Sequence, residues 1–243
     1  MLRIININLI KKNIMARKAC IDDGFNPELV NGAEFDGILE IPMISRASKI
    51  DLPENLVPFS VAKHINLDSK GVVFYEKDAD FANLLIHPDK YLDLLSTANF
   101  VASPDNSVYR DAPLTVQLGN IYKNRALGSY LQRNGVKVIP NIRWGDERTF
   151  TNIIFPEPPA FLGVEKHSIV IIGTYGCSRL VDDKIYLRQG LIAMLSYLEP
   201  EQIIVYGGMP KSVFGDLTKR ADFVHYEDYI SHRLQKGKNG RRS

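Results

Sequence analysis

Four turns in this sequence concentrate side chains of the kinds that bind small molecules or transfer protons. Each turn follows a short apolar run and contains glycine or proline: SPDNSVYRD, PNIRWGDE, GTYGCS and YGGMPKS. Carboxylates in such turns can act as general acids or bases, or can hold a divalent metal through their oxygens. We therefore assign catalytic or metal-binding chemistry to four carboxylates: Asp105, Asp111, Asp146 and Glu147.

Arginine, amide and aromatic side chains in the same turns suit an anionic small molecule or a nucleotide. Trp144 follows Arg143, and it is expected to orient the guanidinium because an arginine over an indole ring is an attractive arrangement. The Gly207-Gly208 turn precedes Lys211, and the free N–H groups at a helix start bind phosphate or carboxylate. The expected ligand-binding residues are Arg110, Asn141, Arg143, Trp144, Thr174, Tyr206, Gly207, Gly208 and Lys211.

The same turns also have structural interpretations. Asp146 and Glu147 suit the first turn of a following helix, because carboxylates complement the positive end of the helix dipole. Ser107 is a candidate N-cap for the helix after it. Arg125 falls on the apolar side of that helix, where an internal structural pairing is favoured over ligand contact because a lone buried charge is costly.

Cysteine and histidine usage indicates no metal site of the zinc type. Cys20 and Cys177 lie far apart in the sequence, which is no disulfide framework and fits a reducing cytoplasm. Cys177 has no histidine beside it and is expected to be a small buried apolar residue rather than a nucleophile. The five histidines share no ligand spacing, so a divalent metal held by carboxylates stays open as the alternative.

From residue 71 onward, short apolar runs alternate with helical patterns. The expected strands are 71–76, 99–105, 136–142, 167–173, 202–208 and 222–226. The expected helices are 78–96 with a break near Pro88, 107–134, 182–200 and 210–220. This alternation predicts an α/β fold with right-handed crossovers and a mostly parallel sheet.

A barrel-like (β/α) arrangement is favoured over an open doubly wound sheet. A barrel directs the carboxyl ends of all its strands to one face, whereas an open sheet uses mainly the ends beside its switch point. Four consecutive strands with polar ends fit the barrel better. Residues 38–44 and 57–62 are candidates for further strands, although the connection from 62 to 71 is too short for a crossover helix.

Three segments are expected along the 243 residues. Residues 1–56 form an N-terminal lead-in, at the end of which LPENLVPF (52–59) resembles an extended linker. Residues 57–230 form a single α/β domain. Residues 231–243 form a basic tail, expected to be flexible, with five arginines and lysines and no acid.

Composition excludes several classes of protein. With 45% hydrophobic and 24% charged residues the chain is of ordinary globular type, and no apolar run approaches the ~18 residues of a membrane span. Its N-terminus lacks the pattern of a secretory signal, so a cytoplasmic protein without membrane contact is expected. The net charge of +2 is too small to indicate a basic nucleic-acid-binding surface, although the tail could contact phosphate non-specifically.

The stretch from SPDNSVYRD through PNIRWGDERTF, followed by GTYGC and IIVYGGMP, resembles an uncharacterised family of bacterial, phage and mobile-element proteins, catalogued as domain of unknown function 4417. The resemblance covers roughly residues 55 to 230. It brings no established activity, and it implies a cytoplasmic protein often carried by phages or integrated elements.

Two functional hypotheses follow from these observations. The favoured one is an enzyme that acts on a phosphate-bearing, nucleotide or nucleic-acid substrate at the carboxyl ends of the parallel strands. The alternative is a non-catalytic accessory factor of a mobile element, which binds DNA or a protein. The polar residues at the strand ends motivate the first hypothesis, and the basic tail motivates the second.

Overall fold

Two parallel sheets form the centre of the protein, whose computed structural model describes residues 26–48, 50–175 and 180–232. One sheet contains β3 (Asn55–Pro58), β4 (Lys70–Val73), β5 (Phe100–Ala102) and β6 (Val138–Ile139). The other contains β7 (Ile169–Gly173), β8 (Gln202–Tyr206) and β9 (Phe223–Tyr226). Every pair of neighbouring strands in these sheets is parallel, so the prediction of an α/β fold with a mostly parallel sheet is confirmed.

The two sheets meet at the edge strands β6 and β7. Asn141, just after β6, forms a parallel bridge with Ile171 of β7. The Ile142 N–H donates to the Ile171 carbonyl at 2.9 Å, and the Ile171 N–H donates to the Pro140 carbonyl at 2.9 Å. Because the strands are parallel, this bridge brings the residues after β6 beside the carboxyl end of β7.

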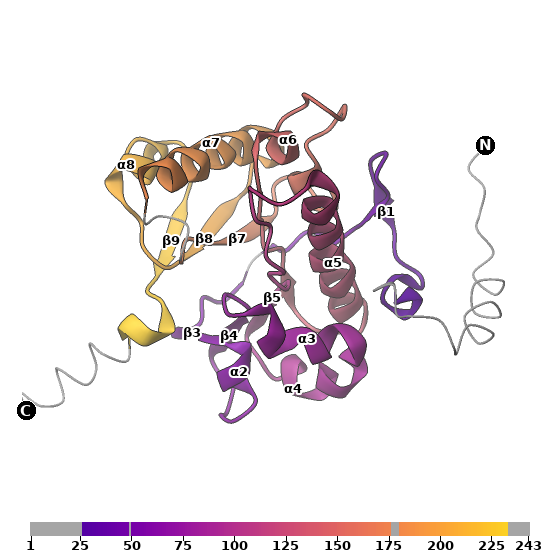
Figure 1. Cartoon of the computed structure of the whole chain (residues 1–243). Coiled ribbons are helices and arrows are strands. Elements are labelled where there is room, and N and C mark those ends of the chain that lie inside the picture. The colour runs from indigo at the N-terminus through magenta and orange to yellow at the C-terminus, as the bar shows by residue number, and fades with distance from the viewer. Residues whose placement is uncertain (1–25, 49, 176–179, 233–243) are drawn as a thin grey trace, which may run out of the picture.

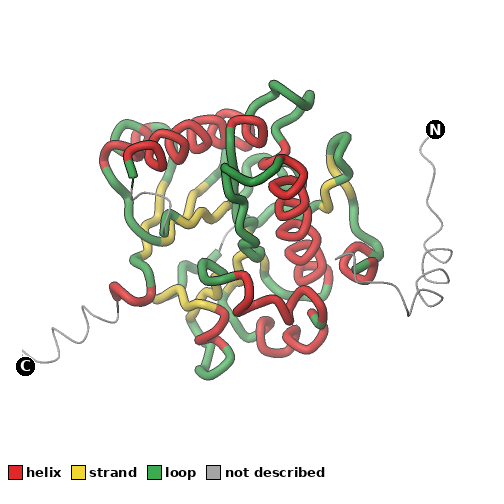
Figure 2. Tube along the Cα trace, viewed as in Figure 1, coloured by secondary structure: helices red, strands yellow, loops and turns green. Residues whose placement is uncertain are grey.

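Helices connect the strands and cover their outer faces (Figures 1 and 2). The connecting α-helices are α2 (Phe59–Ala62), α3 (Asp78–Ile86), α4 (Leu92–Ser96), α5 (Leu114–Arg133), α6 (Glu147–Phe150), α7 (Val181–Leu198) and α8 (Lys211–Phe214). Short 3-10 turns occur at η1 (Pro27–Val30), η2 (Pro88–Tyr91), η3 (Pro159–Phe161) and η4 (Leu217–Lys219). Within the described ranges, no helix has both the length and the apolar composition needed to cross a lipid bilayer.

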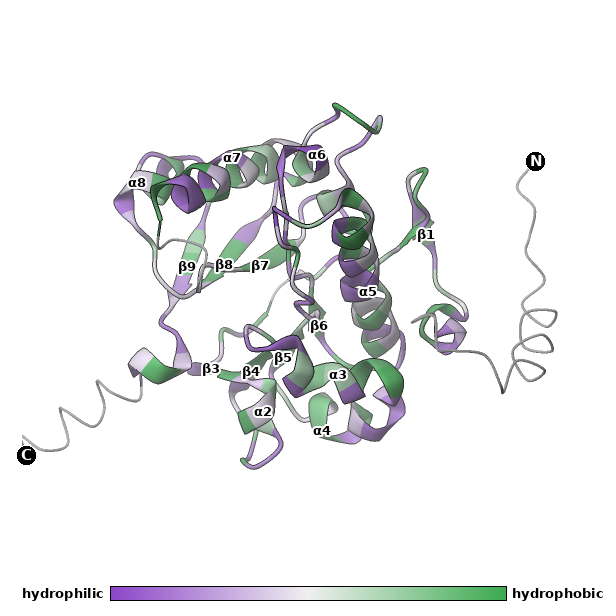
Figure 3. Ribbon diagram, in the orientation of Figure 1, coloured by the Kyte–Doolittle hydropathy of each residue, from purple (hydrophilic) through white to green (hydrophobic). Residues whose placement is uncertain are grey.

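The strands have apolar side chains on both faces, which alternate between two layers of the core. In β7, Val170 and Ile172 pack against α7, whereas Ile169 and Ile171 belong to a cluster on the opposite face. That second cluster takes buried residues from both sheets: Leu56, Val73, Phe100, Ala102, Ile139, Ile169, Ile171, Ile204 and Tyr206. Figure 3 shows mainly hydrophobic residues along β7 and β8, and hydrophobic and hydrophilic residues mixed along α5 and α7.

The N-terminal part of the described chain forms a hairpin rather than a strand of the main sheets. β1 (Phe35–Asp36) pairs antiparallel with β2 (Ile41–Pro42), where the sequence suggested one strand over 38–44. Ile44 then forms a parallel bridge with Val164, and β2 packs against α5.

Two sequence predictions about elements before α5 are wrong. Residues 52–59 are not simply a linker, because β3 begins at Asn55 and pairs in parallel with β4. The predicted strand at 57–62 is instead the end of β3 followed by α2, and the crossover from β3 to β4 consists of this short helix and residues 63–69.

The helix predicted over 107–134 begins only at Leu114, directly after Pro113. A proline is tolerated at the start of a helix but not in its interior. Residues 103–113 are therefore a loop, and Ser107 is not an N-cap: its hydroxyl donates to the Asp78 carboxylate at 2.8 Å. The predicted break near Pro88 is confirmed, since Pro88 begins the η2 turn between α3 and α4.

Candidate functional site

Two adjoining cavities lie beside the carboxyl ends of the parallel strands, and Val108, Tyr109 and Arg143 line both of them. The narrow cavity measures about 330 Å³ and is lined by Val108, Tyr109, Arg110, Asp111, Ile142, Arg143, Trp144, Gly145, Ile172, Gly173, Asp183, Tyr186 and Leu187. The wide cavity measures about 820 Å³. Both volumes fall in the range of ~300–1,000 Å³ that is typical of small-molecule sites.

The wide cavity collects side chains from the ends of many strands. Its lining residues are Pro58, Ser60, Val61, Tyr75, Glu76, Lys77, Asp78, Asp80, Asp105, Ser107, Val108, Tyr109, Arg143, Tyr175, Tyr206, Asp228, Tyr229 and Ile230. Asp105 follows β5, Arg143 follows β6 and Tyr206 ends β8, so three of the residues singled out in the sequence share one opening.

A hydrogen-bonded network fixes Arg143 at the boundary between the two cavities. Its Nε donates to Asp105 Oδ1 at 2.8 Å, and its Nη2 makes a second, close contact to Asp105 Oδ2. Asn141 Nδ2 also donates to Asp105 Oδ1 at 2.8 Å, and the Tyr75 hydroxyl donates to Asn141 Oδ1 at 2.9 Å. Bidentate arginine–carboxylate pairs are strong and directional, so Asp105 determines where the guanidinium lies.

Tyr206 supports this network from the side. Its ring stacks on Tyr75 with centroids 5.1 Å apart, and its hydroxyl accepts a hydrogen bond from the Tyr229 N–H at 2.9 Å. Burial raises the pKa of Tyr206 to about 12. The hydroxyl therefore stays protonated at neutral pH and serves as a hydrogen-bonding group rather than a base.

The indole of Trp144 lies away from the Arg143 guanidinium. Trp144 Nε1 donates to the Tyr186 carbonyl at 3.3 Å, and the ring packs against Gly190, where an added Cβ would lie 2.2 Å from Nε1. The guanidinium lies instead over the Tyr75 ring, 5.7 Å from its centroid. The expectation that Trp144 orients Arg143 is therefore wrong, because α7 holds the indole.

Arg110 and Asp111 reach the narrow cavity from the loop before α5. The Arg110 guanidinium lies 4.7 Å from the Tyr186 ring centroid and 3.5 Å from an oxygen of Asp183. Its Nη1 atom is buried and has no hydrogen-bond partner in the described part of the chain. An unsatisfied buried donor costs about 1–3 kcal/mol, which makes this atom unusual. Asp111 is exposed at the edge of the same cavity.

Sequence reasoning missed Asp183 and Tyr186, which line the narrow cavity from α7. The two residues lie three positions apart, so they share one side of the helix. Asp183 is an acid of the first turn of α7, and its carboxylate accepts a hydrogen bond from the Leu180 N–H at 3.1 Å. The spacing of Asp183 and Tyr186, an acid and an aromatic residue on one side of the same helix, is the sequence signal that could have pointed to this site.

Asp146 and Glu147 have the structural role that the sequence left open as an alternative. Asp146 caps α6, and its carboxylate accepts from the Arg148 N–H at 2.9 Å and from Gln117 Nε2 at 2.6 Å. The hydrogen bonds from the Arg148 side chain are the main reason that the pKa of Asp146 lies below its ordinary value. Glu147 is exposed on α6, and neither carboxylate lines the two cavities.

The Gly207-Gly208 turn is fixed by internal hydrogen bonds. The Gly207 N–H, at a φ of +104° that favours glycine, donates to the Tyr226 carbonyl at 2.8 Å. Thr174 is buried, and its hydroxyl donates to the Gly208 carbonyl at 2.7 Å. Lys211 is exposed at the start of the four-residue helix α8. None of these residues lines the cavities, so the expected phosphate-binding turn lies outside them.

The wide cavity carries more acids than bases. Glu76, Asp78, Asp80, Asp105 and Asp228 line it together with Lys77 and Arg143. Two of the acids hold loops: Glu76 accepts from the Ser60 N–H at 3.0 Å, and Asp78 accepts from the Ser107 N–H at 3.1 Å.

In the described residues, no three histidine, cysteine or acidic side chains are grouped to hold a metal ion. Cys177 and residues 233–243 of the basic tail lie outside the described residues.

Sequence comparisons place most of the chain in one family without an assigned activity. Residues 33–227 match the family described as a domain of unknown function (DUF4417). The Gene 1 protein of Mycobacterium phage L5 is 26% identical over 180 residues, which cover 73% of this chain and 76% of that protein. The Gene 1 protein of Mycobacterium phage D29 is 25% identical over 171 residues, 69% of this chain and 60% of that protein. No solved structure matches the chain.

Proposed function

The chain belongs to the family described as a domain of unknown function (DUF4417) and has phage relatives, and we propose that it is an enzyme acting on a nucleotide or another phosphate-bearing small molecule. The substrate binds at the carboxyl ends of the parallel strands. One observation carries the proposal: Arg143 lies at the boundary of two adjoining cavities, where Asp105 fixes its guanidinium. Planar guanidinium groups match phosphate and carboxylate in shape and charge.

A barrel-like arrangement of the strands is part of this proposal. The strands β3 to β9 follow one another in chain order within the two sheets, and the bridge between Asn141 and Ile171 joins the sheets. The apolar cluster on their shared face takes residues from β3 through β8. The Tyr226 hydroxyl of β9 donates to the Pro53 carbonyl just before β3, at 2.8 Å. In such an arrangement the carboxyl ends of all strands face one site.

Charge limits the ligand to a single anionic group. The wide cavity has five carboxylates against two cations, so it disfavours a polyphosphate. We place the anionic group against Arg143 and the uncharged part of the ligand in the two cavities. Asp105, which touches Arg143, is then the carboxylate closest to the bound anion, and Asp111 is a second candidate for proton transfer from the narrow cavity.

Isothermal titration calorimetry with adenosine monophosphate, uridine monophosphate, ribose 5-phosphate and adenosine triphosphate tests the proposal. We expect the monophosphates to bind, the triphosphate to bind more weakly, and Arg143→Gln to reduce monophosphate affinity at least about tenfold, a change of ~1.4 kcal/mol. The matched control is Arg46→Gln, since Arg46 pairs with Glu201 on the surface, outside both cavities. Equal binding by the two variants, or no binding of any monophosphate, contradicts the proposal.

The alternative function is a non-catalytic accessory factor that binds DNA or a protein. The basic residues of the 231–243 tail motivate its DNA-binding form, and residues 233–243 lie outside the described residues. A gel-shift series over salt concentration with and without that tail tests it separately, since phosphate contacts weaken steeply as salt increases.

A further inference from the structure

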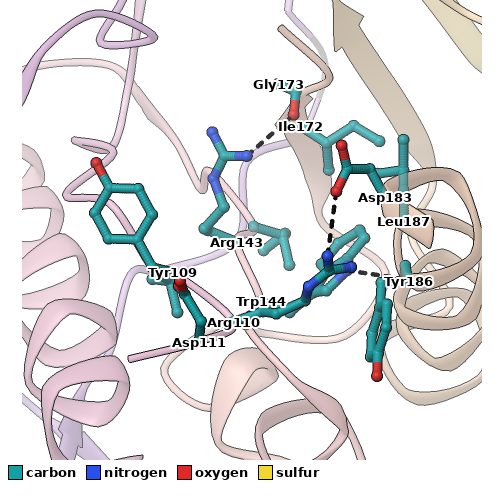
Figure 4. Close-up of a pocket in the computed structure, with 13 residues that line it drawn as sticks. Tyr109, Arg110, Asp111, Arg143, Trp144, Ile172, Gly173, Asp183, Tyr186 and Leu187 are labelled. Carbon is teal, nitrogen blue, oxygen red and sulfur yellow. Dashed lines mark hydrogen bonds and ion pairs between the residues drawn. The ribbon is translucent and has the colours of Figure 1, made fainter. Parts of the chain in front are cut away.

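The narrow cavity combines a buried polar donor with aromatic and apolar walls. Arg110 Nη1 is the buried donor without a hydrogen-bond partner in the described chain. Figure 4 shows Tyr109 on one side of the cavity and Asp183, Tyr186 and Leu187 of α7 on the other. Trp144, which lies below Arg143 in this view, also lines the cavity. A group that fills this space therefore needs flat or apolar surfaces together with a hydrogen-bond acceptor.

Arg110 is held so that this donor has a defined position. Asp183 lies 3.5 Å from its guanidinium, and the Tyr186 ring lies under the guanidinium at 4.7 Å. The Leu180 N–H in turn donates to the Asp183 carboxylate, so the acid has its own support at the start of α7. A fixed guanidinium can recognise an acceptor by geometry as well as by charge.

The volume of the narrow cavity fits one part of a ligand rather than a whole ligand. At about 330 Å³ it lies at the small end of the range for small-molecule sites, ~300–1,000 Å³. Arg143 lines it on the side shared with the wide cavity. A ligand that places its phosphate against Arg143 can therefore reach into the narrow cavity with a single ring system.

We propose that the narrow cavity binds a nucleobase, and that Arg110 recognises an acceptor atom of the base through Nη1. This inference rests on the proposed function and names the class of the substrate: a nucleoside monophosphate. Carbonyl oxygens and ring nitrogens of the bases are the acceptors that arginine contacts elsewhere. Base stacking on aromatic side chains such as Tyr109 and Trp144 is also sequence-tolerant, so Arg110 supplies the discrimination.

Trp144 is the only tryptophan of the chain, so its fluorescence reports directly on the narrow cavity. We expect adenosine, guanosine, uridine or cytidine to quench this fluorescence, and ribose 5-phosphate to leave it unchanged. Arg110→Gln is expected to weaken the binding of the preferred nucleoside at least tenfold while ribose 5-phosphate binds as to the wild type.

A second variant keeps the test independent of folding. Tyr109 is 65% exposed, so Tyr109→Ser removes a wall of the cavity with little loss of core packing. Phe35→Ser is the matched control, because Phe35 is also a half-exposed aromatic residue and lies outside both cavities. We expect only Tyr109→Ser to reduce the quenching.

The outcomes separate this inference from the proposed function. If no nucleoside changes Trp144 fluorescence, or if Arg110→Gln leaves nucleoside affinity unchanged, the nucleobase assignment is wrong even where ribose 5-phosphate binds. If nucleosides quench Trp144 but ribose 5-phosphate does not bind, the nucleobase site stands and the phosphate site at Arg143 fails.

Discussion

Two arginines on neighbouring segments of the chain, Arg125 and Arg143, have opposite surroundings. The guanidinium of Arg125 in α5 is fully buried and donates to three backbone carbonyls: Asn141 at 2.7 Å, Ala160 at 2.9 Å and Leu162 at 3.0 Å. Arg143 instead pairs with the carboxylate of Asp105 and lines both cavities. The first arginine ties loops together inside the fold, whereas the second faces space that a ligand can enter.

The role of a charged side chain therefore depends on its hydrogen-bond partners and on whether a ligand can reach it. Burial lowers the pKa of Arg125 to about 10, so the guanidinium is still protonated at neutral pH, and fixed carbonyls satisfy it. One of those carbonyls belongs to Asn141, whose side chain donates to Asp105 in the network around Arg143. Arg125 thus acts on the site only by holding its backbone, and Arg143 can act on a ligand directly.

The same comparison separates Asp146 from Asp105. Both carboxylates are almost buried and both pair with an arginine. Asp146 uses its oxygens to cap α6 and to bind Gln117, away from the cavities, whereas Asp105 lines the wide cavity. Residues that hold the fold together, such as Arg125 and Asp146, and residues that line the cavities, such as Asp105 and Arg143, should therefore differ in how strongly their substitution lowers the free energy of unfolding.

The largest expected effect is at Arg125. Arg125→Met keeps the apolar stem but leaves three buried carbonyls without a donor, and each unsatisfied group costs about 1–3 kcal/mol. We expect the free energy of unfolding to fall by at least about 3 kcal/mol, measured from urea denaturation followed by Trp144 fluorescence. Arg125→Lys is the control, since it retains the charge with fewer donors and should lose less. A loss below about 1 kcal/mol for Arg125→Met contradicts a framework role.

A smaller effect, dependent on pH, is expected at Asp146. Asp146→Asn keeps the capping oxygen but removes the charge that binds Arg148, so we expect a loss of about 1–2 kcal/mol at pH 7. Since the pKa of Asp146 is lowered in the folded state, its stabilisation is complete above the ordinary value of 3.8 and disappears as the pH falls through the folded-state pKa. Urea denaturation at several pH values should show the two proteins converging below about pH 4.

Nucleotide binding should not change in Asp146→Asn, because Asp146 lines neither cavity. A variant that keeps its full stability but loses ligand affinity would instead assign Asp146 to the site, as the sequence first suggested.

The sequence predicts the fold better than it predicts this division of roles. Alternating apolar runs predict the parallel sheets, and the strand-end rule groups Asp105 with Arg143 because their strands are neighbours in chain order. It also groups Lys211 with them, although α8 carries that side chain outside the cavities. Periodicity gives the face of a helix but not what lies opposite, so Asp183 and Tyr186 of α7 could not be assigned to the narrow cavity.

The hydrogen-bond partners of buried charged groups were equally inaccessible to sequence reasoning. Arg125 was expected to have an internal structural partner, and the partners prove to be backbone carbonyls, which no sequence pattern marks. Asp105 and Asp146 look alike in sequence, each in a turn after a strand and each near an arginine. Only the cavity beside Asp105 separates them, and a cavity depends on how distant segments pack.

The smallest effect on stability is expected when both members of the cavity pair are replaced. Arg143→Met alone leaves the Asp105 carboxylate almost buried without its cation, which costs stability. In the double variant Asp105→Asn with Arg143→Met, the new amide oxygen still accepts from Asn141 Nδ2 and no buried charge remains. Because replacing both partners of an interaction can be nearly neutral, we expect the double variant to lie within about 1 kcal/mol of the wild type. It should nevertheless lose monophosphate binding in calorimetry, since the ligand-binding cation is gone.

Arg125 has no such rescue, because its partners are backbone atoms that no substitution removes. A double variant as unstable as Arg125→Met would place the Asp105–Arg143 pair in the framework and leave the cavities without a dedicated anion-binding residue.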